Sequence, residues 1–231
     1  MAEPESLGQV LQNSPTLAQA KASPSLPMSA SEAALREGDR IRTAAAKLKC
    51  SGVEDRHLSK LPEVLRQHKE WSAMVDRAWK LLEASAPILA FLGDRGNGKT
   101  QAAVTLIRRA ITYEQKTAKY LRCRQVGALV RASYRPDSEV SEVEVMSDLA
   151  RSWLLVLDEC QERFTTDHEL QTLTMLLDLR YGACRPTILI ANCSEADFVA
   201  LMGPAIIDRM REGGGALVFT WASFRGGRIS T

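Results

Sequence analysis

The stretch that decides the fold is Gly93-Asp94-Arg95-Gly96-Asn97-Gly98-Lys99-Thr100. It matches the pattern G-x-x-x-x-G-K-[ST]. The apolar run 87–92 before it predicts a buried strand, and the amphipathic run 100–107 after it predicts a helix. A strand that turns on glycines into a helix directs backbone N–H groups and the positive end of the helix dipole at an anion. We therefore predict a phosphate-binding loop whose eight residues contact a nucleotide. Lys99 would reach the outer phosphates, and the Thr100 hydroxyl would bind Mg²⁺. The alternative is a chance match in a glycine-rich turn.

Polar side chains follow the two strongest strand candidates, 153–157 and 187–191. Asp158 and Glu159 come after the first run, and Asn192 comes after the second. Ligands of open α/β sheets bind at the carboxyl ends of the strands, so we expect these residues beside the phosphate-binding loop. Asp158 would hold Mg²⁺ directly or through water, and Glu159 would polarise the water that attacks the γ-phosphate of ATP. Asn192 would donate to that phosphate or orient the same water. An ordinary strand-to-loop exit is the competing interpretation for all three.

Asp208-Arg209-Met210-Arg211 follows a predicted short helix and precedes the last predicted strand. An arginine of this group could reach the nucleotide of a neighbouring subunit, because an arginine supplied in trans stabilises charge on the transferring phosphoryl group. A surface ion pair with Asp208 is the alternative.

The remaining pattern predicts an α/β fold with a parallel five-stranded sheet. A weak strand at 118–122 and another at 216–221 complete the sheet. Helices are expected between the strands and before the first one, at 62–84, 123–133, 142–151 and 168–181. Alternating strands and helices are typical of a doubly wound sheet with helices on both faces.

The first 50 residues differ from the rest in composition. Residues 1–28 hold four of the nine prolines and predict a flexible tail, and a capping box at 29–32 begins a basic helix that extends to about residue 49. We therefore expect a small flexible and helical N-terminal region at 1–50 and a nucleotide-binding domain at 51–231.

The bulk composition favours a cytoplasmic protein. The 231 residues include 30 basic and 28 acidic side chains, so nucleic-acid binding would need a local patch. Five cysteines without a C-x-x-C pair indicate reduced thiols rather than a zinc site or a disulfide framework. The start of the chain does not resemble a signal peptide, and its apolar runs are far shorter than a membrane span.

A local basic patch does occur between Arg108 and Arg135. This range contains eight arginines and lysines and only one acidic residue, Glu114. Basic side chains with an aromatic residue among them are suited to bind single-stranded DNA. The basic groups contact its phosphates, and its bases stack on the aromatic ring. The residues that we expect to bind single-stranded DNA are Arg122, Arg124, Arg131, Tyr134 and Arg135. A solvated face, balanced by the acidic run 137–148, is the alternative.

Beyond these motifs, four segments carry a further likeness: residues 207–211, the run Val218-Phe219-Thr220-Trp221-Ala222-Ser223-Phe224-Arg225, Cys50-Ser51-Gly52-Val53 and Arg185-Pro186-Thr187. In these segments the chain resembles the DnaC/IstB group of AAA+ ATPases, and most of all its DnaC-type helicase loaders. The resemblance covers about residues 50–228. Loaders typically have a threonine where this chain has Asn97, a conservative difference, and residues 1–50 are shorter and more polar than a helicase-docking domain.

The resemblance implies a P-loop NTPase fold without a lid domain. It also implies an ATPase that escorts a hexameric DnaB-type replicative helicase onto single-stranded DNA and self-associates on the helicase or the DNA. By position, Arg209 resembles the arginine finger, Asn192 resembles sensor 1, and Arg225 resembles a sensor-2 arginine that contacts nucleotide. Residues 1–50 become the candidate helicase-docking segment.

Two other functions stay open at this point. An IstB-type transposition helper would act on a transposase and on duplex DNA, and would form filaments without any helicase. A plain adaptor would use its nucleotide site only for structure. Replacing Glu159 with Gln would trap ATP in an enzyme and leave an adaptor unchanged.

Overall fold

The computed structural model describes residues 30–59, 61–84, 88–162 and 167–224. By its internal contacts the chain divides into residues 1–40 and 41–231, and the two units are described separately. Helix α2 (Ala30–Lys49) contains this division and continues through Gly38 without a break. The predicted tail at 1–28 and the Ser29 cap lie outside the described residues, and the boundary at residue 50 stays a prediction.

Five parallel strands form one sheet in the order β2-β3-β4-β1-β5, which confirms the predicted fold class. Along β1, Leu89 and Phe91 enter one core, whereas Ile88 and Ala90 enter the other. The inner strands read as unbroken apolar runs because both of their faces are buried. The strands are β1 (Ile88–Gly93), β2 (Ala118–Arg122), β3 (Leu154–Asp158), β4 (Thr187–Ile190) and β5 (Gly215–Phe219).

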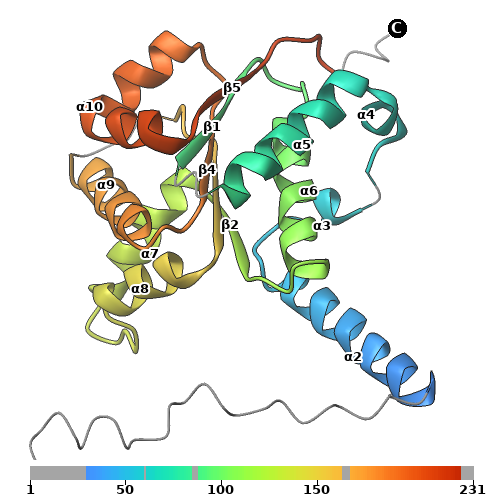
Figure 1. Ribbon diagram of the computed structural model, residues 1–231. Coiled ribbons are helices and arrows are strands. Elements are labelled where there is room, and N and C mark those ends of the chain that lie inside the picture. The colour runs from blue at the N-terminus through green and yellow to red at the C-terminus, as the bar shows by residue number, and fades with distance from the viewer. Residues whose placement is uncertain (1–29, 60, 85–87, 163–166, 225–231) are drawn as a thin grey trace, which may run out of the picture. The chain divides into compact units, whose positions relative to one another are not determined.

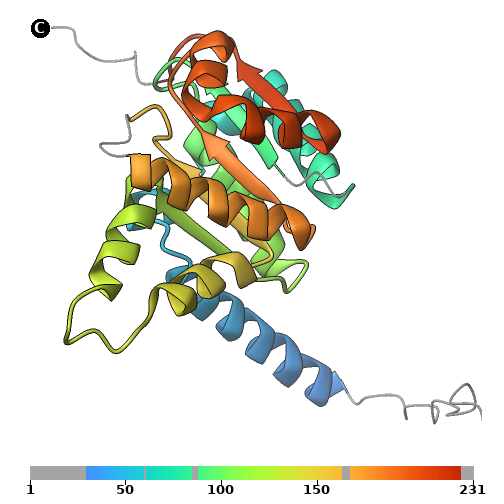
Figure 2. The same ribbon diagram turned by 90° about the vertical axis from the view of Figure 1, so that its left-hand side faces the viewer.

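Helices cover both faces of this sheet, as predicted (Figure 1). One layer contains α3 (Asp55–Leu58), α4 (Glu63–Gln67), α5 (Lys69–Glu83) and α6 (Lys99–Thr112). The other layer contains α7 (Cys123–Ser133), α8 (Glu142–Arg151), α9 (Asp167–Gly182) and α10 (Glu195–Gly213), and Figure 2 shows it from the front. None of the helices described has the length and apolar character to cross a membrane.

The prediction of one helix over 62–84 is wrong at His68. This residue has an extended backbone (φ −82°, ψ 104°), and it separates α4 from α5. Its Nδ1 atom accepts a hydrogen bond from the N–H of Trp71 at 3.1 Å, so it caps the N-terminus of α5. The apolar spacing continues across the break, and for that reason periodicity alone did not reveal it.

The position predicted for Asp208–Arg211 is also corrected. These residues lie inside α10 rather than after it, because the helix breaks earlier and then restarts. Gly203 takes a left-handed conformation (φ 74°), and Pro204 follows it. A proline is well suited to the first turn of a new helix, where its missing N–H has no partner to lose.

Candidate nucleotide and metal site

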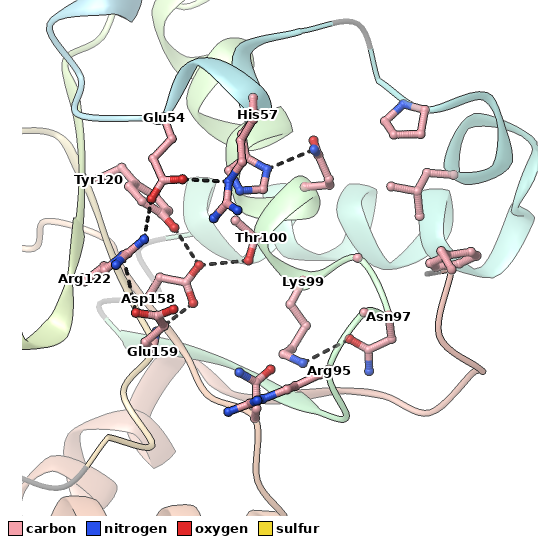
Figure 3. Close-up of a pocket in the computed structure, with 18 of the residues that line it drawn as sticks. Glu54, His57, Arg95, Asn97, Lys99, Thr100, Tyr120, Arg122, Asp158 and Glu159 are labelled. Carbon is pink, nitrogen blue, oxygen red and sulfur yellow. Dashed lines mark hydrogen bonds and ion pairs between the residues drawn. The ribbon is translucent and has the colours of Figure 1, made fainter. Parts of the chain in front are cut away.

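A pocket of about 740 Å³ lies at the phosphate-binding loop and the carboxyl ends of the inner strands (Figure 3). The predicted residues Lys99, Thr100, Asp158, Glu159 and Asn192 all line it. The structure therefore gathers in one cavity side chains that come from three separate segments of the chain.

The loop ends in a left-handed glycine that starts α6. Gly98 has φ 86° and forms the N-cap, and the helix begins at Lys99. A side chain at Gly98 would place its Cβ 2.8 Å from Nε1 of Trp71, so both the conformation and the space require glycine. N–H groups in the first turn of a helix have no carbonyl acceptor earlier in the helix, and a helix N-terminus therefore suits an anion.

Three consecutive carbonyl groups of the loop accept hydrogen bonds from other parts of the chain, and we call these three bonds the carbonyl clasp. Because the C=O and N–H groups at the two ends of a peptide unit point in opposite directions, bonds to the carbonyls on one side leave N–H groups available on the other. The three bonds of the clasp are Phe224 N–H to Gly96 O at 2.9 Å, Trp221 Nε1 to Asn97 O at 2.9 Å, and Trp71 Nε1 to Gly98 O at 3.1 Å. The centre of the His68 ring lies 5.1 Å from that of Trp221.

Asn97, which we expected to be a conservative replacement for threonine, has specific hydrogen-bond partners on both sides. Its side chain is only 1% exposed, and its Nδ2 donates to the carbonyl of Phe219 in β5 at 2.7 Å. Its Oδ1 accepts from Nζ of Lys99 at 3.0 Å. Lys99 Nζ also donates to the carbonyls of Gly93 and Asp94, at 2.8 and 2.7 Å. Asn97 thus joins the lysine to the edge of the sheet, while Arg95 is exposed at the rim of the pocket.

Three donors hold the buried carboxylate of Asp158. Its Oδ2 accepts from the Thr100 hydroxyl at 2.8 Å and from the Tyr120 hydroxyl at 2.7 Å, and its Oδ1 accepts from the N–H of Glu159 at 2.7 Å. The Thr100 and Asp158 oxygens lie side by side, and hard oxygen ligands of this kind fit Mg²⁺ that is bound largely through phosphates and water.

Glu159 has an unusual backbone and a charged partner. Its φ of 60° is left-handed, which costs about 1–3 kcal/mol for a residue with a side chain and is concentrated at functional sites. Its Oε2 lies 3.4 Å from Nε of Arg122, and Arg122 also bonds Glu54 at 2.7 Å. The hydrogen bond from Arg122 lowers the pKa of Glu54, so that carboxyl remains ionised at neutral pH.

Asn192 reaches the same pocket from the end of β4. Its backbone N–H donates to Oε1 of Gln161 at 3.0 Å, which ties the end of β4 to the turn after Glu159. Asn192 and Glu159 therefore line the cavity from adjacent strands.

Arg209 does not line this pocket. On α10, its guanidinium bonds Asp178 of α9 at 2.9 Å and the carbonyl of Ala205 at 2.7 Å. The ion pair with Asp208 that we considered is made by Arg211 instead, at 3.2 Å. Arg225 lies outside the described residues, so its predicted contact with nucleotide stays a prediction.

The predicted DNA-binding residues fall in two places. Arg122 lines the pocket, whereas Arg124, Arg131, Tyr134 and Arg135 lie on α7 and just after it. Arg124 pairs with Glu162 at 3.7 Å, Arg131 pairs with Glu169, and the Tyr134 hydroxyl donates to Glu142 at 2.9 Å.

The other basic residues of the stretch lie on elements other than α7. Arg108 and Arg109 belong to α6, in the layer opposite α7, and Arg109 lies 4.4 Å from the centre of the Trp79 ring. Lys116 lies 3.9 Å from the centre of the Trp153 ring. The run that is continuous in sequence is therefore not one continuous surface.

Sequence reasoning missed several residues of the site. The Tyr120 hydroxyl donates to Asp158, Glu54 accepts a hydrogen bond from Arg122, and His57 contacts Gln101 at 3.1 Å on the pocket wall. Only Tyr120 had a signal, because it lies two residues before Arg122 in a predicted strand, and alternate residues of a strand share a face. The others bond across long stretches of chain, and no pattern in the sequence marks them.

No family model matches the chain. Among curated proteins, the replicative helicase loader DnaC of Escherichia coli K12 is 26% identical over 136 residues, which cover 58% of this chain and 55% of that protein. The uncharacterized protein YdaV of Escherichia coli K12 is 31% identical over 137 residues, which cover 59% of this chain and 54% of that protein. The chain thus matches about half the length of these relatives.

Solved structures are similar in fold. The crystal structure of the DnaC helicase loader aligns with a TM-score of 0.57 and 17% identity, and covers 66% of this chain and 92% of that one. The replication initiator DnaA bound to AMPPCP and single-stranded DNA aligns with a TM-score of 0.55 and 15% identity. The alignment covers 67% of this chain and 46% of that one. These folds, together with the curated matches, confirm the resemblance to DnaC-type AAA+ proteins.

Proposed function

We propose that this chain, DnaC-like in sequence and AAA+ in fold, is an ATPase that delivers a hexameric replicative helicase onto single-stranded DNA during replication initiation. The observation that carries the nucleotide chemistry is the 2.8 Å contact of Thr100 with Asp158, beside a phosphate-binding loop whose carbonyls already accept the bonds of the carbonyl clasp. The similarity to helicase loaders supports the delivery role.

Each residue of the pocket has a chemical task in this proposal. Lys99 exchanges its carbonyl partners for the outer phosphates of ATP, and Thr100 and Asp158 hold Mg²⁺. The bound ion supplies neutralisation of phosphate charge. Glu159 accepts a hydrogen bond from the attacking water and orients it, and Asn192 donates to the γ-phosphate or to that water.

Glu159→Gln tests whether the site hydrolyses ATP. The amide keeps the shape of the side chain but is a poor proton acceptor, so we expect the hydrolysis rate to fall by about 10²-fold or more while ATP stays bound. Phosphate release and ATP retention on the full chain measure the two effects. Glu162→Gln is the matched control, because Glu162 lines the same pocket and pairs with Arg124. An adaptor with a purely structural site would show no change for either variant.

The partner is tested with the full chain and a DnaB-type helicase hexamer. We expect the two to co-elute in size-exclusion chromatography, and we expect removal of residues 1–28 to weaken the complex if residues 1–50 form the docking segment. An IstB-type helper would instead form filaments on duplex DNA without helicase, and electron microscopy would show them.

The proposed single-strand surface is α7 with the turn that follows it. Charge reversal at Arg124 and Arg131 should weaken binding of an oligonucleotide and reduce the slope of log affinity against log salt by about one for each lost phosphate contact. Arg77→Glu, on the exposed face of α5, is the control. An unchanged slope in the double variant would contradict the assignment.

A further inference from the structure

The phenol of Tyr120 extends from the edge strand β2 to the carboxylate of Asp158. The ring is 7% exposed, and its hydroxyl donates to Oδ2 of Asp158 at 2.7 Å (Figure 3). In the register of the sheet Tyr120 lies opposite Val156, and Arg122 lies opposite Asp158. The side chain therefore extends along the strands by two residues to meet the carboxylate.

This hydroxyl completes the set of donors on Asp158. Oδ2 accepts from both Tyr120 and Thr100, and Oδ1 accepts from the N–H of Glu159, so rotation of the carboxylate breaks at least one hydrogen bond.

The backbone of Tyr120 is fixed as well. Its N–H donates to the carbonyl of Ser51 at 2.7 Å, so the turn at 50–53 lies against the outer edge of β2. At Gly52, which has φ 83°, a Cβ atom would lie 2.4 Å from the Tyr120 carbonyl oxygen. Only a glycine lets the turn approach this closely. Tyr120 is therefore held at both its main chain and its side chain.

We propose that Tyr120 is a positioning residue for the metal site: its hydroxyl keeps Oδ2 of Asp158 beside the Thr100 hydroxyl, in the orientation that receives Mg²⁺. This inference rests on the nucleotide site of the proposed function. It predicts that Tyr120 sets the affinity for the metal ion and not the affinity for the nucleotide. Partners that orient a metal ligand typically change metal affinity by about 10- to 100-fold when they are removed.

Tyr120→Phe tests the assignment, because it removes the hydroxyl and keeps the ring. Mn²⁺, a spectroscopic substitute for Mg²⁺, is titrated into the full chain with ADP and followed by electron paramagnetic resonance. Binding of a fluorescent ADP is measured separately in EDTA. We expect Mn²⁺ to bind at least about tenfold more weakly, with ADP affinity in EDTA unchanged. Tyr113→Phe, at an exposed tyrosine after α6, should change neither value.

A second comparison separates positioning from general damage. In a chain that carries Asp158→Asn, the phenol no longer orients a metal ligand, so Tyr120→Phe should cause no further loss of Mn²⁺ affinity. Equal Mn²⁺ affinity in wild type and Tyr120→Phe would overturn the inference alone, as would an equal loss of ADP affinity in EDTA. A wild-type chain that binds no ADP would overturn the proposed function and this inference with it.

Discussion

Arg122 is shared between two carboxylates, one on each side of it. It bonds Glu54 at 2.7 Å, and it lies 3.4 Å from Glu159. Glu54 therefore competes for the cation that restrains the proposed water-polarising residue. Removing the charge of Glu54 leaves Arg122 to pair with Glu159 alone, whereas removing Arg122 releases Glu159, so variants at Glu54 and Arg122 should have opposite effects.

We predict that Arg122→Ala raises the ATPase rate measured without DNA, because Glu159 is released. Glu54→Gln should lower that rate, because Arg122 then pairs with Glu159 alone. Since these are partly exposed ion pairs, each change should be about two- to fivefold, and both should diminish at high salt. Steady-state phosphate release at low and high salt measures the rates. Changes of the same sign in the two variants would contradict the competition.

At the scale of single residues, the sequence predicted which residues line the pocket where their position follows from a strand end or the loop. Asp158, Glu159 and Asn192 line it as expected, because the ends of buried strands are recognisable from apolar runs; their roles stay predictions. Tyr120 and the tryptophans of the carbonyl clasp were not found. Their hydrogen bonds depend on the register between strands and on the return of the chain after β5, and neither of these leaves a local pattern.

The element α9 is joined to three others by Arg180, whose side chain is fully buried. Its guanidinium donates to the end of α8 and to the beginnings of β3 and β4. Burial, and to a smaller extent the charge of Arg185, lowers the pKa of Arg180. Uncharged oxygen atoms accept hydrogen bonds from the guanidinium and stabilise its charge. The acceptors are Leu149 O, Ala150 O, Ser152 O, Trp153 O, Pro186 O and Thr187 Oγ1, at 2.6–3.2 Å.

We predict that Arg180→Lys lowers the free energy of unfolding by at least about 3 kcal/mol, because a lysine cannot reach so many acceptors and leaves buried carbonyls without donors. Urea unfolding followed by circular dichroism measures the difference. Arg77→Lys, on the exposed face of α5, is the control and should change stability by less than about 0.5 kcal/mol. A loss at Arg180 no larger than that of the control would show that the carbonyls find other partners.

The carbonyl clasp is an interaction between elements that acts on the nucleotide site. Trp221→Phe keeps an aromatic ring beside His68 but removes the N–H that bonds Asn97 O. We predict about fivefold weaker binding of ADP, the effect of one lost neutral hydrogen bond, with little change in thermal stability. Trp153→Phe provides the control, because Trp153 packs against Trp79 and Lys116, and not against the loop. Titration with fluorescent ADP measures both, and equal affinities would show that the loop holds its shape without this bond.

Strands were easier to predict than helix boundaries. Every predicted strand is present within two residues of its predicted bounds, because burial on both faces leaves a dense apolar run. The helices at 62–84 and before Asp208 were wrong because a histidine cap at His68 and a left-handed glycine at Gly203 interrupt them. Both interruptions are set by tertiary contacts or by backbone conformation, which periodicity does not register.

At the scale of the whole molecule, the position of Arg209 bears on assembly. It lies on α10 outside the pocket and is held by Asp178 of α9, so within the described residues the pocket is lined without it. An arginine that serves as a finger from such a position would do so for a neighbouring copy of the chain. The ion pair with Asp178 and the bond to the Ala205 carbonyl would then hold the side chain in place until that copy binds.

We predict that Arg209→Ala and Lys99→Ala each abolish most ATP hydrolysis, and that mixing the two restores part of it. In the mixture, some interfaces combine the intact pocket of the Arg209 variant with the intact arginine of the Lys99 variant. A finger worth about 10³-fold or more in rate makes even a small fraction of such interfaces measurable. Arg211→Ala, whose guanidinium pairs only with Asp208 among the described residues, should remain active alone. Activity is measured over a range of protein concentrations on single-stranded DNA with helicase. If the mixture stays as inactive as its parts at every concentration, Arg209 does not act between subunits.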